Sequence, residues 1–149
     1  MVEAAAVPTK VASRIRTILL ATDLTHVSDD ATRQAIDLAS ELGARLLVVN
    51  VIDAAPRQVG RQARVDQLRA EREPSLLHVV SRARERGVEA TFLLWTGEPG
   101  RSIVAAAAAE KADLVVVGTR GLDRAGRFLL GSVSDHVVYH ADCPVLVAR

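Results

Sequence analysis

Residues 114–134 read LVVVGTRGLDRAGRFLLGSVS, and this stretch decides the fold. An apolar strand runs up to Gly118, and a polar loop with further glycines follows it. The loop ends at Gly131 and Ser132, where we expect a helix to begin, since serine is a favourable residue at a helix N-terminus. Ser132 and Asp135 also have the spacing of a capping box. The order of strand, glycine-bearing loop and helix predicts an anion site at the start of that helix.

Three glycines of this segment, at positions 118, 121 and 131, are expected to let the backbone turn sharply and approach a ligand, because glycine has no side chain. Residues 132–134 would then present N–H groups and hydroxyls to phosphate at the positive end of the helix dipole. Glycines that only shape turns, with a serine that only caps, are the alternative interpretation. The segment contains neither the Gly-Lys-Ser/Thr of a Walker loop nor a GxGxxG pattern.

Strand and helix patterns alternate outward from this stretch. Strands are predicted at residues 16–23, 45–51, 88–95, 114–117 and 144–148, and helices at 28–42, 61–86, 98–111 and 132–140. This alternation predicts a single-domain α/β fold, an open five-stranded parallel sheet with helices on both faces. Pro74 either kinks the second helix or separates a mobile first part from a packed second part. Ligands of such sheets bind beyond the carboxyl ends of the strands, at the switch point in strand order.

Composition restricts the class of protein further. Of the 149 residues 49% are hydrophobic but only 3% are aromatic, so the core must be aliphatic. The 19 basic and 18 acidic residues nearly cancel, which argues against a dedicated nucleic-acid binder. No apolar run approaches the roughly 20 residues of a membrane span. We expect a flexible leader at residues 1–14, one domain at 15–149, and a soluble cytoplasmic protein.

Several other side chains have both an ordinary and a functional interpretation. Arg120, Arg124 and Arg127 could neutralise phosphate or could be solvated loop residues. His136 and His140 have a spacing that can hold a metal, but no third ligand accompanies them. Cys143 is expected to be a packed residue, since a redox role would need a partner cysteine. The arginine-rich segment 61–86 is expected to be a solvated helix surface.

The chain resembles the universal stress proteins from about residue 16 to residue 149. Nucleotide-binding members of that family carry G-2x-G-9x-G-(S/T), which Gly118, Gly121, Gly131 and Ser132 match. The segments ILLATD, VNVID, WTGEPGRSIV and CPVLVAR extend the resemblance along the chain. It implies a Rossmann-like fold of the adenine nucleotide alpha hydrolase type, with strand order 3-2-1-4-5. It also implies that the ligand is ATP, with Mg²⁺ accompanying the phosphates.

The resemblance further assigns contacts to individual residues. Asp23 corresponds to an acidic residue near the adenine and ribose, although on its own it could be a strand-end helix cap. Val51 corresponds to a backbone contact to the base, and many members have proline where this chain has Ala21. The full set of expected nucleotide contacts is Ala21, Asp23, Val51, Val117, Gly118, Arg120, Gly121, Gly131, Ser132, Val133 and Ser134.

The expected function is a binding and regulatory module in the stress response. It would hold ATP and act through nucleotide-dependent partner contacts, and the resemblance implies a homodimer formed through residues 144–148. A weak ATPase or self-phosphorylating enzyme is the alternative, with Ser132 or Ser134 as the acceptor. No serine has an obvious histidine base with an orienting acid, so we predict no catalytic residues. AMP or cyclic AMP is a further possible ligand.

Overall fold

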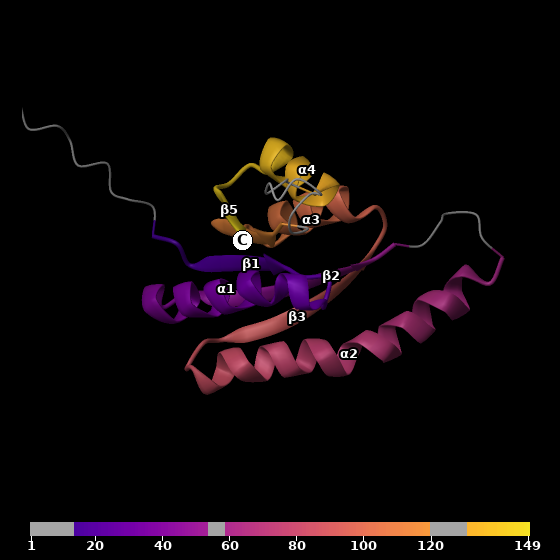
Figure 1. The fold of residues 1–149 in the computed structure, drawn as a ribbon, viewed down its shortest axis with the longest axis horizontal. Helices are drawn as coiled ribbons and strands as arrows, with labels where there is room; N and C mark the ends of the chain where they lie inside the picture. Colours follow the sequence, from indigo (N-terminus) through magenta and orange to yellow (C-terminus); the bar gives the residue numbers. More distant parts are fainter. Residues whose placement is uncertain (1–13, 54–58, 120–130) are drawn as a thin grey trace, which may run out of the picture.

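The apolar runs of the chain form a parallel sheet, which we describe from a computed structural model. The structure describes residues 14–53, 59–119 and 131–149. The strands are β1 (Thr17–Ala21), β2 (Arg45–Ile52), β3 (Ala90–Thr96), β4 (Leu114–Gly118) and β5 (Val145–Ala148). They lie in the order β3-β2-β1-β4-β5, all parallel, as predicted (Figure 1).

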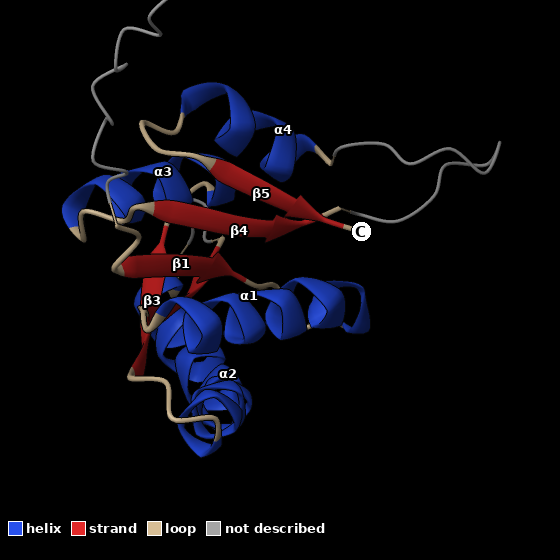
Figure 2. Ribbon diagram, turned by 90° about the vertical axis from the view of Figure 1, so that its left-hand side faces the viewer, coloured by secondary structure: helices blue, strands red, loops and turns tan. Residues whose placement is uncertain are grey.

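Helices cover both faces of the sheet (Figure 2). The 3-10 helix η1 (His26–Ser28) leads into α1 (Asp29–Leu42), which packs with α2 (Arg61–Glu85) on one face. The other face carries α3 (Pro99–Ala109) and α4 (Ser132–His140). Each face has its own aliphatic cluster, centred on residues such as Leu20 and Leu76 on the first and Leu19 and Val137 on the second. The prediction of an aliphatic core is therefore confirmed.

Each strand differs from its predicted bounds by one or two residues, and in β1 and β3 a turn takes up two residues of the predicted strand. β1 stops at Ala21, and the chain then turns through Leu24, which has a left-handed φ of 64°. β3 begins at Ala90 rather than at residue 88, because the N–H of Val88 still bonds to the carbonyl of Ala83 in α2. The turn after β1 places Thr22 and Asp23 directly beyond an apolar strand.

The serine cap predicted at the start of α4 is wrong. Gly131 is the N-cap of α4, so Ser132 is already the first helical residue and the capping box is not formed. Ser28 does occupy the N-cap position of α1, but its hydroxyl makes no capping bond. That hydroxyl donates instead to the carbonyl of Thr25, 2.8 Å away.

The long helix α2 runs unbroken through Pro74. Proline cannot donate to the carbonyl of Ala70, but both residues are exposed, so water can satisfy that carbonyl. With 25 residues the helix is about 38 Å long, and its first half extends past the sheet (Figure 1). Its arginines are not all solvated as predicted: Arg84 donates to the carbonyl of Ala90 at 2.9 Å, and Arg72 also turns toward the sheet.

Two further predictions concern the N-terminal leader and the absence of a membrane span. The proposed flexible leader at residues 1–14 lies almost wholly outside the described residues. Within the described residues, no helix combines the length and apolarity needed to cross a membrane.

Candidate functional site

A cleft of about 180 Å³ opens at the carboxyl edge of the sheet, where β1 and β4 lie side by side and the strand order reverses. β1, β2 and β4 contribute the residues at their ends, and the starts of α3 and α4 close the far side. The lining residues are Ala21, Thr22, Asp23, Val27, Ser28, Val49, Asn50, Val51, Pro99, Ile103, Val117, Gly118, Thr119, Gly131, Val133 and Ser134.

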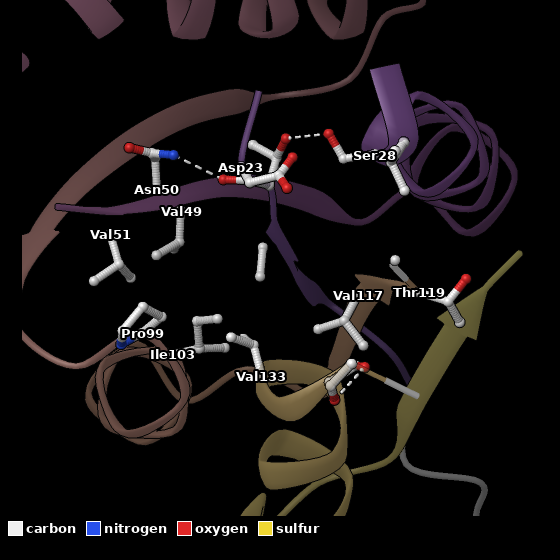
Figure 3. A pocket seen from close by; sticks show the side chains of 16 residues that line it. Asp23, Ser28, Val49, Asn50, Val51, Pro99, Ile103, Val117, Thr119 and Val133 are labelled. Carbon is white, nitrogen blue, oxygen red and sulfur yellow. Dashed lines mark hydrogen bonds between the residues drawn. The ribbon is translucent and has the colours of Figure 1, made fainter. Parts of the chain in front are cut away.

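Two apolar walls face each other across the cleft (Figure 3). Val49 and Val51 stand on the β2 side, and Pro99, Ile103 and Val133 stand opposite them on α3 and α4. Val49 and Ile103 also belong to the cluster beneath α3 and α4, so the cleft is continuous with that core. Such a slot suits a flat, largely apolar ring.

Asp23 follows β1 at the rim of the cleft and also shapes the turn there. Its Oδ1 accepts from the N–H of Thr25 at 2.9 Å and from the hydroxyl of Thr25 at 2.6 Å. Partial burial is the largest single influence and raises the pKa of Asp23, but the hydrogen bonds to the carboxylate, those from Thr25 first, together bring the pKa below its usual value of 3.8. The carboxylate is therefore charged at neutral pH, and it closes the turn after β1 rather than capping a helix. Its contact with a nucleotide stays a prediction.

A buried polar cluster joins the ends of β1 and β2 and was not predicted. The hydroxyls of Thr22 and Ser28 lie 2.9 Å apart, and the side-chain amide of Asn50 donates to the carbonyl of Thr22 at 2.8 Å. Thr22, Ser28 and Asn50 are all less than 10% exposed. The available signal was Asn50, the only residue to interrupt the apolar strand 45–51.

The helix starts at the cleft differ in how their N–H groups are satisfied. At α3, Glu98 accepts from the N–H groups of Gly100 and Arg101 at 3.0 and 2.9 Å. These bonds, that from Arg101 first, lower the pKa of Glu98. At α4 no side chain among the described residues caps the helix, and the Ser134 hydroxyl donates to the Gly131 carbonyl. The start of α4 is therefore the one open to an anion.

The backbone conformation at position 118 does not require a glycine, contrary to our prediction of a sharp turn there. Gly118 ends β4 without a left-handed φ, and an added Cβ would meet Ala31 at 3.7 Å, an ordinary contact. Its place in the cleft lining is compatible with the other predicted reason, a close approach of the backbone to a ligand.

The structure brings most of the predicted contact residues to one place. Those that line the cleft are Ala21, Asp23, Val51, Val117, Gly118, Gly131, Val133 and Ser134. Ser132 is exposed at the start of α4 and does not line the cleft. Arg120, Gly121, Arg124 and Arg127 lie outside the described residues.

The remaining candidate residues lie away from the cleft lining. The rings of His136 and His140 stack with centroids 4.1 Å apart, and His136 packs against Gly100. Cys143 packs at the edge of the second aliphatic cluster. Burial raises the pKa of the Cys143 thiol, and the carboxylates of Asp113 and Asp142 raise it further, so that the thiolate is disfavoured.

An open α/β sheet of this order, with a cleft at its switch point, defines a doubly wound ligand-binding domain. The chain belongs to the universal stress protein family, whose sequence model matches residues 14–149. A universal stress protein of Thermus aquaticus is 40% identical to it, over 90% of this chain and 98% of the relative.

Solved structures of the family share the fold and include nucleotide complexes. A universal stress protein from Archaeoglobus fulgidus in complex with dAMP has a TM-score of 0.72 and 25% identity, over 91% of this chain and 99% of that one. A universal stress protein in complex with cAMP has a TM-score of 0.74 and 27% identity, over 92% of this chain and 99% of that one.

Proposed function

We propose that this protein binds ATP in the cleft, with Mg²⁺ on the phosphates, and acts as a nucleotide-dependent regulatory module in the stress response. The start of α4 carries the proposal: it opens on the cleft, and no side chain in the described part of the chain caps it, so that its N–H groups can bind phosphate. The relatives in complex with dAMP and cAMP support an adenine nucleotide as the ligand.

Each part of the nucleotide has a matching part of the cleft. The base would lie between the apolar walls, with Val51 at its edge. The ribose would lie against Val117 and Gly118, where the charged Asp23 can accept from a ribose hydroxyl. The phosphates would lie at residues 131–134, at the positive end of α4.

The residues of the cleft fit Mg²⁺ only as a companion of phosphate. Mg²⁺ takes oxygen ligands and usually keeps several waters. Asp23 is the only carboxylate among the described residues that line the cleft, and its Oδ1 already accepts from Thr25. The phosphate oxygens would therefore supply most of the ligands. When bound, the ion would neutralise phosphate charge.

The complexes of the relatives favour a second candidate, a nucleotide monophosphate such as AMP or cyclic AMP. Titration with ATP, AMP and cyclic AMP ranks the ligands directly. Slow hydrolysis or self-phosphorylation is tested with γ-labelled ATP: ATP that stays intact supports the binding role. Ser134 is 3% exposed and bonded to Gly131, so Ser132 is the better placed of the two predicted acceptors.

A homodimer through residues 144–148 is part of the proposal. β5 pairs with β4 on one side and lies at the edge of the sheet, so its other side can pair with a second copy. Light scattering with and without ATP tests this, and a monomer under both conditions contradicts it. A cytoplasmic location stays a prediction.

The decisive experiment is calorimetric titration with ATP and, as a matched control, GTP. GTP has the same ribose and phosphates, so a preference for ATP reports the base end of the cleft. We also expect mass spectrometry of the denatured, purified protein to detect released adenine nucleotide. The proposal fails if ATP gives no saturable binding, and its base assignment fails if GTP binds equally well.

A further inference from the structure

β1 and β2 separate at the end of the cleft where the nucleotide base would bind. The last bond between them runs from the N–H of Thr22 to the carbonyl of Val49, at 3.0 Å. In a parallel ladder, alternate residues direct both backbone groups to the same neighbour. Ile52 directs its groups to β3, since its carbonyl accepts from Gly97. Val51 therefore directs its N–H and its carbonyl to the side where β1 has ended.

One more bond of the ladder would join the N–H of Val51 to the carbonyl of Thr22, but it is not made. The side-chain amide of Asn50 donates to that carbonyl instead, at 2.8 Å. The N–H of Val51 has no hydrogen-bond acceptor among the described residues. Since Val51 lines the cleft, this leaves a backbone donor at the base end, where an acceptor from a ligand can satisfy it.

Arg72 holds Asn50 in this position from outside the cleft. Its Nη1 donates to the Oδ1 of Asn50 at 2.7 Å and to the carbonyl of Val51 at 2.9 Å. With its oxygen facing the guanidinium, the Asn50 amide directs its nitrogen to Thr22. Asn50 is 2% exposed, so little water competes for these bonds. Arg72 comes from α2 and does not line the cleft.

We infer that Arg72, acting through Asn50, keeps the Val51 amide unpaired so that it donates to a ring nitrogen of the bound base. The inference rests on the proposed function, in which that base is adenine. Adenine carries ring acceptors N1 and N7 on either side of its amino group. The Val51 carbonyl keeps a second lone pair for that amino group beside its bond to Arg72. Arg72 is thus a positioning residue for base recognition.

The test compares ATP with 1-deaza-ATP and 7-deaza-ATP, in each of which one ring acceptor is replaced by C–H. For the unmodified protein, we expect one analogue to bind on the order of tenfold more weakly than ATP. In Arg72→Met, Asn50 loses its partner and Val51 can pair with Thr22. The ratio should then fall below about threefold. Arg72→Lys should keep the ratio, because both bonds use a single nitrogen that an ammonium can replace.

Arg69→Met is the matched control, since Arg69 is exposed on the same helix, and it should keep the ratio. A purely structural Arg72 would change the melting temperature or weaken all three nucleotides alike. An unchanged ratio in Arg72→Met, or equal binding of all three nucleotides by the unmodified protein, overturns the inference. If the unmodified protein does not bind ATP at all, the proposed function fails instead.

Hydrogen exchange of the Val51 amide, followed by NMR without nucleotide, tests the unpaired donor independently of any ligand. In the unmodified protein we expect it to exchange at least about tenfold faster than the amide of Val49 within the ladder. In Arg72→Met it should become protected. A protected Val51 amide in the unmodified protein overturns the inference, and this measurement still decides the matter if Arg72→Met does not fold.

Discussion

Replacing Gly131 with aspartate should stabilise the protein and weaken ATP binding at the same time. Gly131 is the N-cap of α4, with φ −67° and ψ 162°, an extended conformation that aspartate adopts without strain. An aspartate there can accept from the free N–H groups of the first turn, and we expect a gain of about 0.3–1 kcal/mol. For the repulsion we take a separation of about 5 Å between this carboxylate and a phosphate bound at the helix start. At an effective dielectric constant of roughly 20–80, the repulsion is about 1–3 kcal/mol, or roughly 5- to 150-fold in affinity.

Calorimetric titration with ATP and thermal unfolding without ligand measure the two effects of Gly131→Asp. Gly131→Asn is the control, because asparagine caps helices as well as aspartate does but carries no charge. It should raise the melting temperature similarly while losing less affinity. If Gly131→Asp binds ATP within about twofold of the unmodified protein, the phosphates do not lie at α4. If its melting temperature does not rise, the helix start is not open.

Three further changes test the fold around the cleft. Glu98→Ala removes the cap of α3 and should lower the free energy of unfolding by about 1 kcal/mol in urea, with ATP affinity unchanged. The folded pKa of Glu98 lies below its unfolded value near 4.5, so its contribution is present above that pH. The difference between the two proteins should therefore disappear as the pH falls below that value. Gly97→Ala should cost about 1–3 kcal/mol in the same assay, because φ is 149° and the new Cβ would lie 2.8 Å from the Oγ of Ser102. Pro74→Ala restores the helical bond to the Ala70 carbonyl and should add about 1–3 kcal/mol, whereas no gain would show that α2 needs its proline.

The sheet could be predicted because its strands are apolar runs separated by helix-forming segments. The strand 114–117 contains nothing but leucine and valine, and such a run is typical of a strand buried on both faces. The placement of Asp23 and Val51 beside Gly131 followed from a general rule, since the ends of parallel strands meet at one edge. The N-cap of α4 was harder to predict. Gly131 and Ser132 both lie at the helix start and either residue type can be an N-cap, and the structure has Gly131 in that position.

The contacts that depend on how helices lie against the sheet could not be predicted. Arg72 has the same residue type as its solvated neighbours, and only the rotation and placement of α2 bring it to Asn50. Pro99 and Ile103 line the cleft because α3 starts beside the end of β2, a tertiary relation that no local pattern contains. These two residues of the second wall were missed for that reason, whereas Val133 of the same wall was predicted.

The first half of α2 projects beyond the point where Arg72 bonds the helix to Asn50 and Val51. Its first residue, Arg61, stands eleven positions before Arg72, or about 17 Å along the axis. Two residues after Arg72, Pro74 removes one backbone hydrogen bond of the helix, and the helix is most easily bent there. A change of about 10° in the direction of the segment between Arg61 and Arg72 would move Arg61 by about 3 Å. A displacement of a fraction of an ångström at Asn50 that rotated the helix about Pro74 would therefore be several-fold larger at Arg61.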